Sequence, residues 1–135
     1  MQINVLFEVY KSICKIILPN TLGTGFFIKL EKKNLPFYGI LTCEHVIPEE
    51  LIYSKKTIEV LYNNQKERLK ITLNKNERFI RCYKYMNIDA TIIEIIPKDN
   101  IDKNYFLLPN LEYLNGYEQF IGQEIYIPQY PRGKE

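Results

Sequence analysis

Long apolar runs, a secretion signal and a strong charge are all missing from this chain of 135 residues. A membrane-spanning helix needs about eighteen consecutive apolar residues, and no stretch of this chain comes near that length. The amino terminus has neither the basic start nor the small-residue cleavage site of a signal peptide. A net charge of +2 is too small to argue for binding to nucleic acid or to an anionic membrane. We therefore expect neither a nucleic acid nor a membrane among the partners.

Cysteine and histidine are scarce as well. Cys14, Cys43 and Cys82 are an odd number, stand far apart and form no Cys-x-x-Cys pair. We interpret them as free, mostly buried thiols in a reducing compartment, which favours an intracellular, cytoplasmic location. A zinc site would need more nitrogen and sulfur ligands than three scattered cysteines and a single histidine offer. We therefore expect no metal and no cofactor.

The chain does have the composition and pattern of a small all-β protein. It is 46% apolar and carries eleven tyrosines, which suits half-buried strands. Apolar and polar residues alternate with period two from residue 57 to residue 73, on either side of a turn at residues 63–66. Short segments separated by turns predict six or so antiparallel strands in a small barrel or sandwich. These segments are residues 9–18, 23–30, 37–42, 57–62, 68–73, 79–85 and 89–96.

Three of these segments carry residues that point to a function. Residues 23–26 read Gly-Thr-Gly-Phe, and residues 41–46 read Leu-Thr-Cys-Glu-His-Val. Asp89-Ala90 opens an apolar strand 44 residues after His45. A histidine just past the end of a buried strand is held rigidly and can face a cleft, as a general base requires. An aspartate that leads into so apolar a strand needs a partner for its charge.

Together these three segments resemble the first half of the trypsin-like (chymotrypsin-fold) serine peptidases. The resemblance covers residues 20–133 and implies that His45 is the catalytic base and Asp89 the acid that orients it. It also implies an all-β fold, with a six-stranded antiparallel barrel in residues 1–97. Residues 98–135 would then hold a crossover linker and the first strand of an incomplete second barrel. The implied activity is hydrolysis of peptide bonds in a protein or peptide substrate.

The nucleophile of that family has no counterpart in this sequence. The family places its serine in a Gly-x-Ser-Gly-like turn, whereas Ser12 and Ser54 are the only serines here and neither has a neighbouring glycine. The oxyanion donors and the specificity pocket of the family come from its second barrel. We therefore expect these residues alone to be inactive, as the N-terminal portion of a serine endopeptidase. A cysteine nucleophile in the missing half, as in related viral enzymes, is a third interpretation.

A non-catalytic module is the alternative interpretation, in which a pseudoenzyme β-barrel acts as a protein-interaction surface. Half of an enzyme should expose the apolar surface that its second barrel would cover, and should therefore self-associate. A self-sufficient binding module should be monomeric.

Residues close to the histidine turn are weaker candidates for a role in catalysis. Cys43 and His45 invite a Cys-His nucleophile interpretation, but the resembled family keeps its nucleophile far away in sequence, so we do not expect Cys43 to be catalytic. Thr42 is either an ordinary strand residue or one that holds the turn by a hydrogen bond. Gly23 and Gly25 are expected to permit close approach between strands, since no helix and no Gly-Lys-Ser/Thr follows them.

Overall fold

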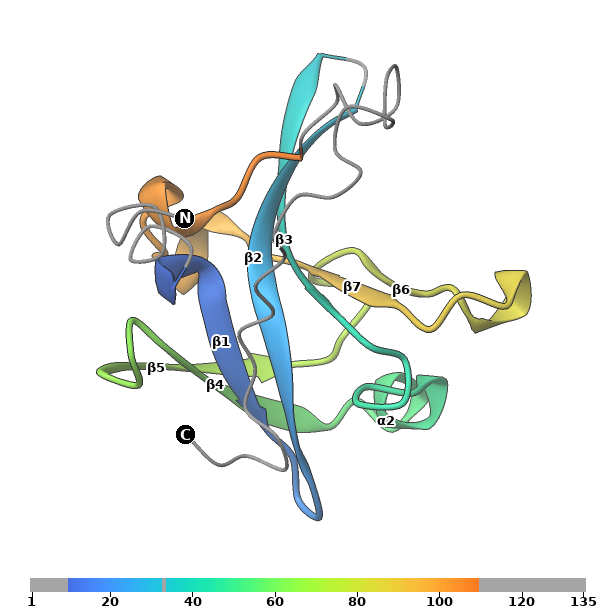
Figure 1. Cartoon of the computed structure of the whole chain (residues 1–135). Coiled ribbons are helices and arrows are strands. Elements are labelled where there is room, and N and C mark those ends of the chain that lie inside the picture. Colours follow the sequence, from blue (N-terminus) through green and yellow to red (C-terminus); the bar gives the residue numbers. More distant parts are fainter. Residues whose placement is uncertain (1–9, 33, 110–135) are drawn as a thin grey trace, which may run out of the picture.

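The computed structural model describes residues 10–32 and 34–109, which form one antiparallel sheet (Figure 1). Within this part of the chain seven strands pair in the order β5-β4-β1-β2-β3-β7-β6. The strands are β1 (Ile13–Ile17), β2 (Leu22–Lys32), β3 (Leu35–Thr42), β4 (Thr57–Tyr62), β5 (Glu67–Thr72), β6 (Ile80–Cys82) and β7 (Thr91–Glu94). Helix α2 (Glu49–Tyr53) and the 3-10 helices η1 (Lys84–Met86), η2 (Pro97–Asp99) and η3 (Lys103–Tyr105) connect or follow them.

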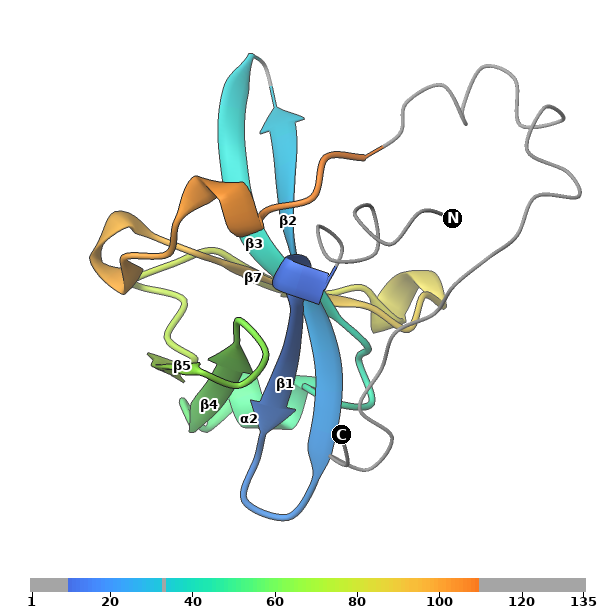
Figure 2. The same ribbon diagram turned by 60° about the vertical axis from the view of Figure 1, so that its left-hand side comes forward.

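The sheet is strongly curled around its longest hairpin, β2–β3. In Figure 2 the β4–β5 pair lies to the left of β1 and β2, and β7 crosses the β2–β3 hairpin, so the sheet is far from flat. The all-β prediction is confirmed for the described residues, and each segment predicted as a strand contains one. The strands number seven where six or so were predicted. β5 and β6 each have one neighbour and are not paired with each other, so the described sheet is a curled half-barrel.

The core lies on one face of this sheet and is built mainly from isoleucine. Fully burying such a side chain stabilises the fold by about 1.5–3 kcal/mol. The ring of Phe27 lies among those of Tyr62 and Phe106, with centroid distances of 5.5 and 5.3 Å. The predicted alternation holds in the first half of β4, where Ile58 is fully buried and Thr57 is exposed, but Leu61 and Tyr62 are both buried at its end. The largest fully buried aliphatic side chains are Ile16, Ile40, Ile47, Ile58, Ile71, Leu73 and Ile93.

Helix α2 was not predicted from the sequence. The histidine turn forms at residues 44–46, and α2 begins directly after Pro48. Pro48 is the extended N-cap, and Glu49 and Glu50 occupy the first turn, where acidic side chains stabilise a helix amino terminus. Ile52 anchors the helix in the core. A proline followed by two acidic residues was the signal for this helix start.

Residues 97–109, where the crossover was predicted to begin, still pack on the sheet. Leu107 forms a parallel bridge with Ile28. Its backbone N–H donates to Phe27 O at 2.9 Å, and its carbonyl accepts from Lys29 N–H at 2.8 Å. The predicted first strand of a second barrel, at residues 121–127, lies outside the described residues. In the part of the chain that the structure describes, no helix is long and apolar enough to cross a membrane.

A buried ion pair joins this carboxyl-terminal segment to the sheet. The guanidinium of Arg78 donates to both carboxylate oxygens of Asp99, at 2.7 and 3.1 Å, and also to Glu94 O at 3.0 Å. The side chains of Arg78 and Asp99 are only 2% and 4% exposed. Asp99 also accepts from the N–H of Ile96 at 2.8 Å. The pair therefore fixes η2 against the end of β7 through several bonds at once.

Candidate active site

His45 stands on a tight turn that follows β3. The backbone N–H groups of Val46 and Ile47 both donate to Cys43 O, at 3.1 and 3.2 Å. Ile47 is fully buried and Val46 is 8% exposed, whereas the side chain of His45 is 71% exposed. Two buried apolar side chains thus anchor the turn and leave the imidazole facing solvent.

Strand β2 holds this turn in place from the neighbouring position in the sheet. A Cβ at Gly23 would lie 2.5 Å from Val46 Cγ1, so glycine alone leaves room for the valine that follows His45. The hydroxyl of Thr42, the last residue of β3, donates to Thr24 O at 2.8 Å and so ties the strand before the turn to β2. The Gly-Thr-Gly segment therefore supports the histidine turn through both packing and hydrogen bonding.

Strand pairing brings Asp89 to the same place. Thr42 and Thr91 are opposite each other in the β3–β7 ladder, so the residues that follow β3 meet the residues that precede β7. The Thr91 hydroxyl donates to Ile47 O at 2.8 Å and joins the start of β7 directly to the histidine turn. The register of two strands thus closes the 44-residue separation between His45 and Asp89.

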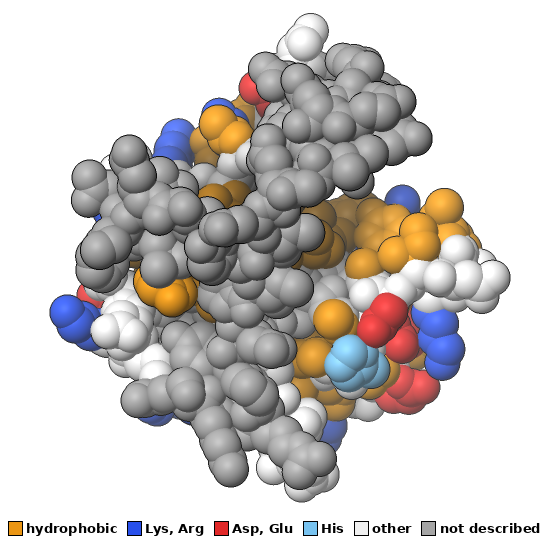
Figure 3. Space-filling view, viewed as in Figure 1, with side chains coloured by type: hydrophobic (Ala, Val, Ile, Leu, Met, Phe, Trp, Pro, Cys, Tyr) orange, Lys and Arg blue, Asp and Glu red, His pale blue; other side chains and the backbone are white. Residues whose placement is uncertain are grey.

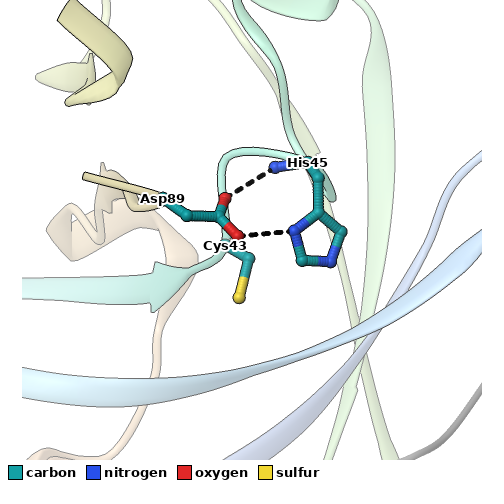
Figure 4. A group of neighbouring side chains, drawn as sticks. All are labelled: Cys43, His45 and Asp89. Atoms are coloured by element: carbon teal, nitrogen blue, oxygen red, sulfur yellow. Dashed lines mark hydrogen bonds and ion pairs between the residues drawn. The ribbon is translucent and has the colours of Figure 1, made fainter. Parts of the chain in front are cut away.

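The carboxylate of Asp89 contacts His45 twice (Figure 4). Oδ2 lies 2.7 Å from His45 Nδ1, and Oδ1 accepts the backbone N–H of His45 at 3.0 Å. The second ring nitrogen, Nε2, points away from Asp89. The side chain of Asp89 is 55% exposed, so both members of the pair are open to solvent. The backbone bond and the side-chain bond together fix the orientation of the ring relative to the carboxylate.

The electrostatics of the pair determine which ring nitrogen carries the proton. The hydrogen bonds from the imidazole and from the backbone N–H of His45 hold the pKa of Asp89 below its usual value. Asp89 is therefore ionised at neutral pH, and an ionised carboxylate only accepts hydrogen bonds. In the neutral imidazole the proton must then lie on Nδ1, which leaves the lone pair of Nε2 free and directed outward.

Cys43 joins this pair, as the sequence spacing suggested. Its sulfur, His45 Nδ1 or Nε2, and a carboxylate oxygen of Asp89 all lie within 4.8 Å of one another. Burial, and then the negative charge of Asp89, raise the pKa of the Cys43 thiol. A raised pKa keeps the thiol protonated and poorly nucleophilic, which agrees with the expectation that Cys43 is not the nucleophile.

The surface beside the pair is partly apolar. A cavity of about 310 Å³ is lined by Glu44, His45, Lys84, Asn87, Ile88 and Asp89. The loop before Asp89 exposes three apolar side chains: Tyr85 at 71%, Met86 at 54% and Ile88 at 48%. Figure 3 shows the histidine at the surface next to acidic side chains. The strand predicted over residues 79–85 is shorter in the structure: β6 ends at Cys82, and the chain turns through η1, with Asn87 left-handed at φ 59°.

No serine of the described residues accompanies the pair. Ser12 is 1% exposed and lies next to the start of β1. Ser54 ends helix α2, where its hydroxyl donates to Glu50 O at 2.8 Å. Neither serine forms a hydrogen bond with His45 within the described part of the chain.

Comparison of the chain with models of known families, with curated proteins and with solved structures found no match. The resemblance to trypsin-like peptidases therefore depends on the residues of the motifs themselves. The geometry of His45 and Asp89 is the structural feature that points to a function.

Proposed function

We propose that the described residues form the base-bearing half of a trypsin-like endopeptidase, with the curled sheet as the first barrel of that fold. The observation that carries this proposal is the double contact between Asp89 and His45, at 2.7 Å to Nδ1 and 3.0 Å to the backbone N–H. A carboxylate bound only to the ring would leave the imidazole free to swing. The added backbone bond supports a role in orienting the ring rather than an adventitious surface ion pair.

The chemistry follows from the tautomer that Asp89 imposes. Nε2 accepts the proton of a nucleophilic hydroxyl or thiol while that group attacks the peptide carbonyl, and the imidazolium that forms is stabilised by the ionised carboxylate. The same proton then passes from Nε2 to the leaving amine. A water molecule, deprotonated by the same nitrogen, hydrolyses the acyl-enzyme in the second half of the reaction.

The proposed enzyme would take its remaining parts from a second barrel, as the resembled family does. These parts are the nucleophile, the oxyanion donors and the specificity pocket. The exposed loop with Tyr85, Met86 and Ile88 directly precedes Asp89, so it would offer an apolar surface next to the base for a bound peptide.

The test uses the full product of the reading frame that encodes these residues. Its hydrolysis of fluorescent casein is compared with that of the His45→Ala variant, which should lose about 10⁴-fold or more in kcat/KM. Lys56→Ala, at an exposed position after α2, is the matched control and should retain activity. A His45→Ala variant as active as the wild type would overturn the proposal, and so would a folded full-length product with no activity on casein or on a mixed peptide library.

A non-catalytic interaction module is the second candidate, and the exposed apolar loop before Asp89 is the observation that favours it. Three neighbouring apolar side chains that are each about half exposed or more are typical of a surface that a partner covers. Substitution of Tyr85 and Met86 by serine would distinguish the two candidates. In the module, the double variant abolishes partner binding while His45→Ala has no effect; in the enzyme, it raises KM and His45→Ala abolishes kcat.

A further inference from the structure

The fold assembles three different metal-binding groups at the histidine turn. The thiol of Cys43, the imidazole of His45 and the carboxylate of Asp89 each offer a ligand atom, and these atoms lie within 4.8 Å of one another. Cys43 and His45 come from one turn whose backbone is closed by the bonds to Cys43 O. Asp89 comes from the start of β7 and is tied to that turn by the backbone N–H of His45. The backbone that carries all three ligands is therefore already in place.

The spacing of these ligands is close to that of a tetrahedral zinc ion. With zinc–sulfur and zinc–nitrogen bonds of about 2.3 and 2.1 Å, two ligand atoms of such a site lie about 3.5 Å apart. Atoms up to 4.8 Å apart would thus have to approach each other by up to about 1.3 Å. The separation of 2.7 Å between Asp89 Oδ2 and His45 Nδ1 would open by about 0.8 Å. Side chains that are 55% and 71% exposed can make this movement by rotation.

The chemistry of the set selects zinc over a hard cation. Thiolate and imidazole are ligands of zinc and other borderline or soft ions, whereas magnesium and calcium take oxygen ligands. A thiolate and a carboxylate together neutralise the charge of a divalent ion. Three protein ligands also leave one position open for water, as in exchangeable or catalytic zinc sites rather than closed structural ones.

We propose that Cys43, His45 and Asp89 bind a zinc ion, and that the bound ion and the base function of His45 exclude each other. The exclusion, which rests on the proposed function, follows from the ring tautomer. Base function needs the proton on Nδ1, hydrogen-bonded to Asp89, with a free lone pair on Nε2. When zinc binds Nδ1, the ring proton must lie on Nε2. The same ion also binds the carboxylate of Asp89, which can then no longer accept a hydrogen bond from the ring. Zinc at this site would therefore switch the imidazole from a proton acceptor to a proton donor at Nε2.

Cobalt(II) tests the binding site directly, because a cobalt–thiolate bond absorbs in the near ultraviolet. The 135-residue chain, reduced and metal-free, is titrated with cobalt and then with zinc. We expect a thiolate-to-cobalt band that saturates at one equivalent and disappears on addition of zinc. Cys43→Ala should abolish the band and weaken zinc binding by at least about a hundredfold, since even loss of an outer-shell partner weakens binding by about 10–100-fold.

Two further cysteine variants are the matched controls. Cys14→Ala and Cys82→Ala each remove a buried thiol that is not a ligand of the proposed site and should retain the cobalt band, with folding checked by circular dichroism. The absence of a cobalt band in the wild-type chain would overturn the proposal. A band that persists in folded Cys43→Ala would overturn it as well.

The ring tautomer gives an independent readout that does not depend on peptidase activity. Nitrogen-15 spectra of His45, the only histidine of the chain, should show the proton on Nδ1 without metal and on Nε2 with zinc. An unchanged tautomer with zinc bound would overturn the exclusion. Because both measurements follow binding alone, a chain that binds zinc but lacks peptidase activity would refute only the function proposed above, and an active enzyme without zinc binding would refute only this inference.

Discussion

Gly23 lies so close to Val46 that a Cβ on Gly23 would come within 2.5 Å of Val46 Cγ1 and 2.8 Å of Cγ2. Val46 follows His45 directly and is buried, so this contact connects strand β2 to the orientation of the imidazole. The glycine at the start of the Gly-Thr-Gly-Phe segment is therefore part of the support of the candidate site, although it carries no chemical group.

Gly23→Ala should destabilise the fold by about 1–3 kcal/mol, because an added methyl group in a packed region forces neighbouring atoms to shift. The double variant Gly23→Ala with Val46→Ala removes the clash. Its loss of stability should be smaller than the sum of the two single losses, because residues in contact are not additive. Urea denaturation of the four proteins measures this coupling. Simple additivity of the two changes would show that the contact does not constrain the turn.

Asp99→Asn should be among the most destabilising single changes, because it leaves the buried guanidinium of Arg78 without its counter-charge. Removing one partner of a buried ion pair typically costs about 3–5 kcal/mol. Lys98→Ala, one position earlier, is the control: its ammonium bonds to Glu77 at 3.1 Å, but both side chains are exposed, so the loss should stay below about 1 kcal/mol. Similar urea midpoints for the two variants would contradict the structural importance of the Arg78–Asp99 pair.

The strands and the His–Asp pair were predictable from sequence for different physical reasons. β4 and β5 repeat apolar residues with period two, and this local pattern is sufficient to identify a half-buried strand. The pairing of His45 with Asp89 is not local, and it was predicted only because their segments resemble those of a known family. The register of Thr42 opposite Thr91 is the structural reason for it.

Features that depend on tertiary contact alone were missed. No sequence pattern shows that Arg78 would be buried against Asp99, 21 residues away, since most arginines are exposed. For a related reason, the metal site proposed above was not predicted. The sequence offers too few nitrogen and sulfur ligands for a closed zinc site. An open site needs only a third ligand, and here that ligand is the carboxylate of Asp89, which strand pairing brings to Cys43 and His45. Helix α2 was missed because a proline followed by acidic residues, here Pro48-Glu49-Glu50, can end a strand but can also begin a helix.

Thr91→Val should destabilise the protein by about 1–3 kcal/mol, because it removes the hydroxyl that donates to Ile47 O at 2.8 Å and leaves a buried carbonyl with a poorer partner. The two side chains have similar shapes, so the loss reports mainly the hydrogen bond. Thr57→Val is the matched control at an exposed strand position, where the hydroxyl meets that of Thr72 at 3.0 Å; it should change stability by less than about 0.5 kcal/mol. Amide hydrogen exchange at Val46 and Ile47 should accelerate in Thr91→Val only.

The lowered pKa of Asp89 predicts how its contribution to stability varies with pH. Its pKa is lowered in the folded protein because the imidazole and backbone N–H of His45 donate to the ionised carboxylate. A group whose pKa is lower in the folded than in the unfolded state stabilises the fold above its unfolded pKa, which is about 3.9 for aspartate. That contribution is lost as the pH falls through the folded pKa. Asp89→Asn should therefore be less stable than the wild type at pH 6, and the difference should shrink as the pH falls below about 4.

Glu67→Gln is the control for this pH dependence, since Glu67 is exposed at the start of β5. Its stability should follow that of the wild type across the same pH range. Urea denaturation at steps from pH 6 to pH 2.5 gives both differences. A wild-type advantage over Asp89→Asn that stays constant down to pH 2.5 would mean that the loss in the variant comes from packing. The ionised carboxylate would then contribute nothing to holding His45, and no electrostatic interaction would orient the imidazole as a base.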